Sequence, residues 1–310
     1  MINKINWPND KQFAFTIVDD TDRSTVENTK PVYDYLYLKG LRTTKTVWVY
    51  ESRNKFSGQT ILDKDYFDFV KEIQRRGFEI ALHNAGSGKF NRAEILSALE
   101  KYKKLIGEYP TMQINHADNI DNIYWGSKRF LFPVNFIYSL MRRRYKPLGE
   151  VESSDHFWGD FCKEHIKYIR NRTFNDINSL NVDPTMPHYE IGKTKYSNYW
   201  FSSCDAATAK EFAEVLSPKH VDKLVQEGGL CIIYTHFFSK YVDEEQNLDR
   251  GFIDAIDYMA TQNGWFAPAT EILDFLLQQK SMPEEETLTL MQTLKLDFRW
   301  LFERCFRKID

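Results

Sequence analysis

The chain has 310 residues, with 41 lysines and arginines against 44 aspartates and glutamates, and a formal net charge of −3. Hydrophobic residues make up 42% and aromatic residues 15%, which can fill a sizeable core and excludes a disordered or collagen-like chain. The balanced charge excludes a general nucleic-acid binder, which would need a basic excess. The four cysteines are widely spread, so we expect buried free thiols in a reducing compartment, not a disulfide framework.

The chain shows neither a secretory signal nor a membrane span. Its first eight residues lack the apolar stretch of a signal peptide, and no apolar run is long enough to cross a bilayer. We therefore expect a cytoplasmic protein. The nearest candidate for membrane contact is 130–144, an apolar run that ends in three consecutive arginines. It could rest on an anionic membrane surface, or it could be an ordinary packed helix whose basic end complements its dipole, which we favour.

Apolar, β-rich runs recur along the chain, usually after a glycine or a proline. Since glycine adopts the left-handed conformation of a helix C-cap without strain, a glycine before a strand indicates that a helix has just ended. The predicted strands are 13–18, 43–50, 78–82, 112–114, 230–234 and 265–267.

Helix-like segments lie between most of these runs. The predicted helices are 26–39, 66–76, 93–106, 209–226 and 252–262. Strand and helix therefore alternate, which favours parallel strands joined by crossover helices. The number of such units suits a closed α/β barrel better than an open sheet.

The predicted barrel covers residues 1–280. Within it, 128–199 keeps the alternation poorly, and we interpret it as an insertion that shapes one rim. Residues 281–310 form an extension with apolar residues at helical spacing between charges. They predict an amphipathic helix that packs on the body or joins a partner subunit, and the oligomeric state is left open.

Polar residues follow four of the predicted strands. Asp19 and Asp20 end the first strand, and His83, His116 and His236 each follow a later one. In a barrel of parallel strands these positions lie at the carboxyl face, where active sites are built. We therefore expect the five side chains to converge on one rim.

The residue types at this rim suit metal-assisted hydrolysis. Two carboxylates after an apolar strand are costly unless they are solvated, paired or metal-bound, and adjacent residues point in different directions. One of them could bind a metal while the other handles a proton, whereas Asp22 is expected only to complement a helix dipole. Carboxylate and imidazole ligands suit a divalent metal such as zinc, which acidifies bound water and polarises a carbonyl. An imidazole opposite would protonate the leaving group.

At these residues the sequence resembles the polysaccharide deacetylases, the NodB-homology or carbohydrate esterase family 4 group. The resemblance lies in three motifs at predicted strand ends, Thr16–Asp20 (T-I-V-D-D), Glu79–His83 (E-I-A-L-H) and Ile232–His236 (I-I-Y-T-H). It extends from about residue 10 to about residue 275. It implies a distorted (β/α)7-type barrel, here with an inserted segment and a C-terminal helix.

The resemblance also implies roles for the matching residues. Asp19 would be the catalytic base, Asp20 and His83 metal ligands, and His236 the catalytic acid. The family's second motif has a further histidine four residues on, where this chain has Ser87. His116 is therefore our third ligand.

Further assignments from the resemblance are looser. Asp118 or water could replace His116 as a ligand. The family's arginine that holds the base is missing from 112–124, and Arg92 could take its place. Asp205 could match the aspartate that orients the acid histidine. Ser87 could contact the acetyl group, and Trp125 and Trp200 could stack on sugar rings.

The leading hypothesis is a metal-dependent deacetylase that acts on an N-acetylated sugar or glycan precursor. An enzyme that stays inside the cell would meet such precursors before export, as in surface-polysaccharide biosynthesis. One alternative keeps the barrel and metal but changes the bond, as in an O-acyl esterase or another amidohydrolase. A second alternative is a non-catalytic glycan-binding protein. The residues leave open the sugar, the metal, and N- against O-deacetylation.

Overall fold

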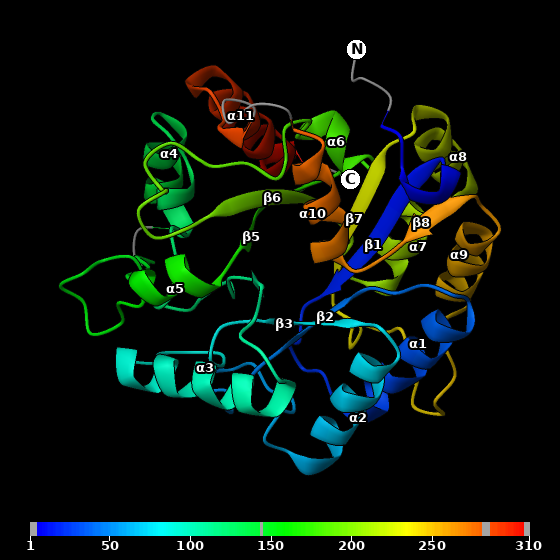
Figure 1. The fold of residues 1–310 in the computed structure, drawn as a ribbon, viewed down its shortest axis with the longest axis horizontal. Coiled ribbons are helices and arrows are strands. Elements are labelled where there is room, and N and C mark those ends of the chain that lie inside the picture. Colours follow the sequence, from blue (N-terminus) through cyan, green and yellow to red (C-terminus); the bar gives the residue numbers. More distant parts are fainter. Residues whose placement is uncertain (1–4, 143–144, 281–285, 307–310) are drawn as a thin grey trace.

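The computed structural model describes residues 5–142, 145–280 and 286–306, and every strand pairing in these ranges is parallel (Figure 1). The strands are β1 (Phe13–Asp19), β2 (Thr44–Val47), β3 (Glu79–Leu82), β4 (Met112–Gln113), β5 (Tyr168–Phe174), β6 (Tyr199–Asp205), β7 (Leu230–Thr235) and β8 (Gly264–Phe266).

Helices precede or follow nearly every strand. The α-helices are α1 (Val26–Leu38), α2 (Lys64–Arg75), α3 (Arg92–Ile106), α4 (Val134–Met141), α5 (Gly159–His165), α6 (Ser179–Val182), α7 (Ala209–Val215), α8 (Pro218–Glu227), α9 (Arg250–Ala260), α10 (Ala269–Gln278) and α11 (Leu290–Phe306), and the 3-10 helices are η1 (Pro8–Asp10) and η2 (Gly126–Arg129). Capping boxes at Thr25, Asn91 and Thr208 start α1, α3 and α7. Gly107 and Gly228 end α3 and α8 in the left-handed conformation, as the glycine pattern predicts.

The sheet closes on itself through β1. Its strand order is β2-β3-β4-β5-β6-β7-β1-β8, with an additional pairing between β2 and β1. One edge of β1 pairs with β7, while the other edge is shared by β8 at Phe13–Phe15 and by β2 at Val18–Asp19. Strands β1 to β7 therefore form the barrel and β8 an extra strand beside it. The distorted (β/α)7-type barrel expected from the sequence is confirmed.

Two barrel strands, β5 and β6, are missing from the strands predicted by the sequence. β5 has the sequence YIRNRTF, whose charged residues conceal a strand that is almost wholly buried. The segment 128–199, expected to be an insertion, therefore contains β5, and only the parts around it lie outside the barrel. The predicted helix 209–226 is two helices, because Ser217 is extended and Pro218 starts a new helix.

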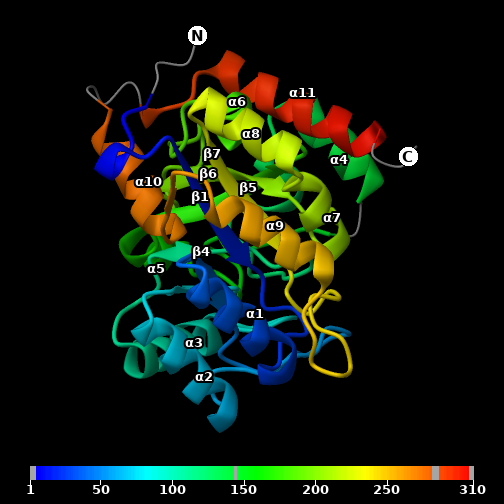
Figure 2. The same cartoon turned by 90° about the vertical axis from the view of Figure 1, so that its right-hand side faces the viewer.

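The C-terminal helix α11 packs on the body of the barrel. Its Leu296 and Trp300 share an apolar cluster with Phe130, Val134 and Phe174 from the segment before α4, from α4 itself and from β5. Figures 1 and 2 show α11 beside α4 at one end of the molecule. Of the two sequence-based expectations for 281–310, the structure shows packing on the body for the part it describes.

Two other sequence expectations can be compared with the structure. Cys162, Cys204 and Cys231 are buried and free, whereas Cys305 is free but exposed. Among the described residues, no helix combines the length and the apolar character that crossing a membrane requires.

Candidate metal centre and active site

A pocket of ≈ 590 Å³ opens where the barrel strands end. Its walls are supplied by the segments that follow β1, β3, β4 and β7, by β5 and β6, and by α11. Four of the five side chains expected at this rim line the pocket, namely Asp20, His83, His116 and His236. Asp19 is absent from the lining, and Asp22 is present in it. The expected convergence of histidines at one rim is therefore observed.

Asp22 lies at the centre of this group. Its Oδ1 is 2.6 Å from His116 Nε2, and its Oδ2 is 3.3 Å from His83 Nε2 and 3.2 Å from His236 Nε2. Asp22, His83 and His116 are all buried, and each offers a ligand atom within 4.8 Å of the others. This is a donor set that suits a divalent transition metal.

The two buried imidazoles are turned so that Nε2 faces the carboxylate. His83 Nδ1 lies 2.9 Å from the carbonyl oxygen of Ile114, which can only accept, so Nδ1 carries the proton. His116 Nδ1 is 3.1 Å from Asn119 Oδ1. In the neutral ring each Nε2 then carries a lone pair and no proton. His83 Nε2 is buried and has no hydrogen-bond partner. An acceptor pair such as His116 Nε2 and Asp22 Oδ1 needs a cation between its atoms, either a proton or a metal ion.

The charges of this cluster shift its pKa values in opposite directions. Burial alone would raise the pKa of Asp22, but its interactions with the three imidazoles outweigh burial and hold it well below the ordinary value. Burial alone would lower the pKa of His116 and of His236, but the hydrogen bonds with Asp22 raise both. The metal-free cluster therefore favours imidazolium around a carboxylate, and a bound cation would replace those protons.

Asp19 and Asp20 point in different directions, as expected for adjacent residues. Arg170 on β5 binds Asp20 through two parallel hydrogen bonds of 2.9 and 2.5 Å, and Asp20 lines the pocket. Asp19 is fully buried in an ion pair of 2.8 Å with Lys45, accepts from Phe237 N and lies outside the pocket lining. Burial raises the pKa of Asp19, while Lys45 opposes the rise. The structure thus places Asp20, not Asp19, where substrate can reach it.

Asn84 and Asn119 hold the loop that carries His116. Asn84 has a left-handed backbone (φ 59°) directly after His83; its Oδ1 accepts from His116 N and its Nδ2 donates to Asp121. Asn119 Oδ1 accepts from Gly88 N, and its Nδ2 donates to Gly86 O. These contacts fix the amide orientation of Asn119 and therefore the ring of His116.

The C-terminal helix contributes to the pocket wall. Trp300 and Arg304 of α11 line it, and Arg304 Nη2 donates to Asp205 Oδ2 at 2.8 Å. Asp205 ends β6 and lines the pocket, where its Oδ2 accepts hydrogen bonds from Arg304 and Thr173. Trp125 also lines the pocket, as expected.

Besides Asp19, four predicted residues lie away from the pocket lining. Ser87 donates to Asn54 Oδ1, and Arg92 pairs with Asp160 on the outside of the barrel, so Arg92 does not hold either aspartate of the β1 end. Asp118 is exposed beside Arg142, and Trp200 is fully buried in the core. A ligand role for Asp118 and sugar stacking on Trp200 are therefore not supported by their positions.

Sequence reasoning missed Asp22 and Arg170. Asp22 was expected to complement a helix dipole, but the N-cap of α1 is Thr25 and Asp22 contacts three histidines instead. The signal was present, because Asp20 and Asp22 are two residues apart after a strand end. Arg170 could not be found without recognising β5.

No family model and no curated protein matches the chain. Among solved structures it is similar to a chitin deacetylase from Colletotrichum lindemuthianum (13% identity, TM-score 0.44, 85% of this chain and 88% of that one). It is also similar to a family 4 acetyl xylan esterase from Clostridium thermocellum in complex with a cobalt ion (14%, 0.42, 89% and 100%). A third similar structure is a mutant of a CE4 family pseudoenzyme (11%, 0.40, 86% and 69%). At these low identities, the chemistry of the site follows from the residues of this chain and not from those similar structures.

Proposed function

We propose that this protein is a metal-dependent hydrolase that removes an acetyl group from an N-acetylated sugar or glycan precursor. The observation that carries the proposal is His83 Nε2, a buried lone pair without a hydrogen-bond partner beside the Asp22 carboxylate. Most buried polar atoms are hydrogen-bonded, and His83 Nε2 differs from the other unpartnered imidazole nitrogen of the described residues, His188 Nδ1, in lying within 4.8 Å of the ligand atoms of Asp22 and His116. A histidine that is oriented by a backbone carbonyl and left open at Nε2 fits a metal ligand.

Asp22, His83 and His116 would hold the metal, and zinc suits one carboxylate with two imidazoles. His83 and His116 are the imidazole ligands expected from the sequence. The carboxylate ligand is Asp22 in place of the expected Asp20. Such a metal would lower the pKa of water and polarise the acyl oxygen. Asp20 and His236 lie outside this ligand set, beside it in the pocket lining.

In this proposal Asp20 is the general base. Its Oδ2 lies 3.9 Å from His83 Nε2, so a water beside the three ligands is within its reach. Asp20 would take the proton of that water as the oxygen attacks the acyl carbon. Arg170 holds the carboxylate by both oxygens and is a positioning residue. The base therefore moves one residue on from Asp19, which Lys45 retains in the barrel wall.

His236 is the proposed general acid. Its Nε2 faces the same space from the opposite wall, 3.2 Å from Asp22 Oδ2 and 3.4 Å from the hydroxyl of Tyr234. As the C–N bond breaks, imidazolium would give its proton to the departing amine, and the acyl carbon would leave as acetate. Hydrogen bonding to Asp22 raises the pKa of His236 against the effect of burial, which favours the protonated form that this step requires.

Metal content tests the proposed ligand set. The purified protein is analysed for bound metal after zinc reconstitution, next to Asp22→Asn, His116→Ala and, as a matched control outside the pocket, Ser87→Ala. We expect one ion per chain in the wild type and in Ser87→Ala, and loss in the other two variants. Metal retained by Asp22→Asn and lost by Asp20→Asn would restore the original assignment.

Activity tests the reaction itself. The reconstituted protein is assayed for acetate release from N-acetylated chito-oligosaccharides and from O-acetylated xylan. Release from the first supports the proposal, and release from the second alone favours the O-acyl esterase. Stoichiometric metal binding with no release from either would contradict the proposed deacetylation on these substrates.

A further inference from the structure

Arg129 is an unusual member of the pocket wall. It ends η2, lines the pocket and is only 7% exposed. Its guanidinium carbon lies 4.1 Å from the ring centroid of Trp125, 4.8 Å from that of Phe130 and 4.9 Å from that of Trp300. Aromatic rings therefore surround a full positive charge beside the site.

This charge has no acidic partner within the described parts of the chain. Arg129 donates to the carbonyl oxygens of Gly126 (3.5 Å) and Asn171 (3.2 Å), and it forms no ion pair there. The acids near it are bound elsewhere, because Asp205 accepts from Arg304 while Glu190 and Asp297 accept from Arg172.

A buried cation without a counter-ion is costly, and the rings offset only part of that cost. Burial lowers the pKa of Arg129 to about 10, so it stays protonated at neutral pH. A guanidinium also has five N–H donors in a planar fork, of which the two carbonyls use few. Because Arg129 lines the pocket, its remaining donors are available to a ligand there.

We propose that Arg129 binds an anionic group of the substrate, a carboxylate or a phosphate outside the acetyl group. A guanidinium fork matches both groups bidentately, and Trp125 and Trp300 would pack against the sugar or spacer that carries the anion. This inference rests on the proposed function and narrows its substrate class to acidic glycans or phosphate-bearing precursors. Arg129 is then a specificity-determining residue.

The test measures anion binding without the metal. Wild-type protein is dialysed against a chelator and then into plain buffer near pH 8, and inorganic phosphate, glucuronate and neutral glucose are titrated by calorimetry. The variants are Arg129→Gln, Arg129→Lys and, as a matched control on the outside of the barrel, Arg92→Gln. Circular dichroism confirms that each variant is folded.

We expect phosphate or glucuronate to bind wild type and Arg92→Gln alike, and to bind Arg129→Gln about tenfold more weakly, the loss typical of one charge-assisted hydrogen-bonded contact. Arg129→Lys, which keeps the charge but loses the fork, should fall between them. The stronger of the two anions identifies the group. Equal binding in wild type and Arg129→Gln, or no binding to either, would overturn the inference. A failure of metal binding or catalysis would leave this result unaffected, because the titration uses metal-free protein.

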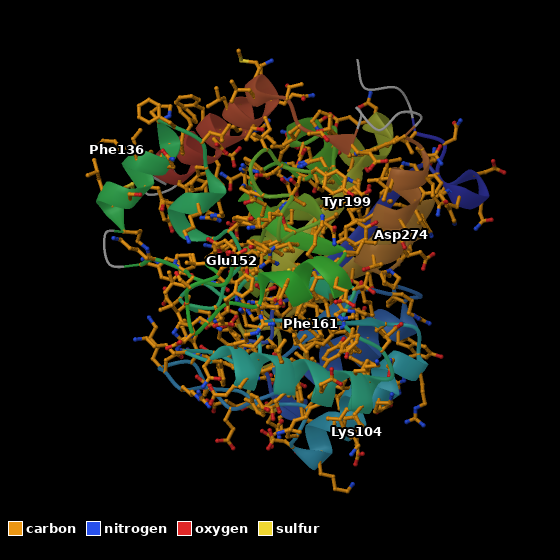
Figure 3. All side chains as sticks on the ribbon, turned by 60° about the vertical axis from the view of Figure 1, so that its left-hand side comes forward. Lys104, Phe136, Glu152, Phe161, Tyr199 and Asp274 are labelled. Carbon is orange, nitrogen blue, oxygen red and sulfur yellow. The ribbon has the colours of Figure 1, made fainter. Side chains whose placement is uncertain are left out.

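A second, independent feature is an apolar surface on and before α4, which we call the α4 patch: Phe132, Phe136, Leu140 and Met141. These side chains are 74%, 57%, 49% and 66% exposed. Figure 3 shows Phe136 at the outer edge of the molecule. Apolar residues gathered in this way mark an interaction surface more often than an ordinary solvated helix.

The charge around the α4 patch indicates what it binds. No acidic residue occurs between 130 and 149, whereas 142–144 are all arginines and Lys146 follows. We propose that the α4 patch docks on an anionic lipid surface, with its apolar side chains inserted and Arg142 and Lys146 at the headgroups. A second copy of the chain is a poorer occupant, since pairing through α4 would bring like charges together. The sequence analysis favoured an ordinary packed helix, but only Val134 of α4 is buried.

Sedimentation with vesicles tests this docking. The protein is mixed with vesicles of phosphatidylcholine alone and with vesicles containing roughly one-third phosphatidylglycerol, a usual anionic content for such assays. We expect binding to the anionic vesicles, weakened by salt and lost in Phe136→Ser/Leu140→Ser. The control Leu38→Ser changes a 75% exposed leucine on α1 and should bind as wild type does. No binding to anionic vesicles, or a dimer that the double variant abolishes, would overturn it.

Discussion

The protein contains two clusters of buried charge, one around Arg172 of β5 and one around Asp22. In the first, behind the pocket wall, Arg172 donates to Glu190 at 2.7 Å and to Asp297 at 2.5 Å, and Asp297 also accepts from Leu131 N. In the second, Asp22 faces three histidines, and His83 Nε2 has no hydrogen-bond partner. Both are buried and ionic, so neither burial nor charge tells them apart.

The two clusters differ in whether their ionisable side chains have hydrogen-bond partners for the atoms that face each other. The Arg172 cluster joins β5 to α11 and to the segment before β6, with the charged atoms of Arg172 and Asp297 directed at each other, so its role is to hold the C-terminal helix on the barrel. In the Asp22 cluster the lone pair of His83 Nε2 is buried beside the carboxylate without a hydrogen-bond donor. A buried polar group that the chain does not satisfy is the better marker of a ligand site.

The largest effect is expected at the Asp22 cluster, on the catalytic rate. Replacing His236 with glutamine removes the proposed acid, so we expect kcat to fall about 10²- to 10⁴-fold, the usual contribution of general acid catalysis. The glutamine side chain can still donate to Asp22, so we expect the free energy of unfolding to change by only about 1 kcal/mol, the typical value of one hydrogen bond. Steady-state kinetics and urea unfolding measure the two quantities. A large loss of stability would show that His236 belongs with the structural cluster.

The Arg172 cluster should show the opposite behaviour, with a loss of stability and no loss of metal. Asp297→Asn leaves Arg172 and Lys193 with Glu190 as their shared carboxylate, so the cluster holds one buried positive charge in excess. We expect about 3 kcal/mol of destabilisation, at the lower end for breaking a buried pair. Urea unfolding gives the free energy, and elemental analysis of the folded protein should still find the metal. Loss of metal at conditions where the variant is folded would contradict the separation of the two clusters.

A smaller effect concerns pH in the metal-free protein. Hydrogen bonding to Asp22 raises the pKa of His116 and His236, so their stabilisation is complete below the unfolded pKa, about 6.5, and is lost as pH rises through the higher folded values. The depressed pKa of Asp22 has the opposite effect on stability, because the stabilisation from this carboxylate is lost as pH falls through its folded pKa. We expect the unfolding free energy to fall as pH rises above neutral, by about 1.4 kcal/mol for each unit of pKa shift. Denaturant titrations at a series of pH values measure it, and a flat profile would contradict the cluster's charge state.

The smallest effect is expected for Ser87, which tests where the active site ends. Ser87→Ala removes one hydrogen bond to Asn54, outside the pocket lining, and should cost about 1 kcal/mol or less. Metal content and kcat should match the wild type. A drop in either would place Ser87 in the site, as the sequence resemblance suggested for it.

Much of the barrel could be predicted because local rules decide it. β1, β3 and β7 are apolar runs, and their helices carry capping boxes or glycine C-caps that a sequence displays. Prediction failed at β5, where Arg170 and Arg172 are buried but charged. Their partners, Asp20 and Asp297, are more than a hundred residues away, so no local pattern marks the strand as part of the core.

By itself the sequence determined that strands and helices alternate and that histidines stand at strand ends, because periodicity and glycine placement are local. Only the tertiary structure decided which carboxylate meets those histidines. Side chains after Val18 turn with the backbone, so that Asp19 meets Lys45, Asp20 meets Arg170 and Asp22 meets the imidazoles. These partners come from other strands and are set by barrel closure, a long-range property that no short segment of sequence contains.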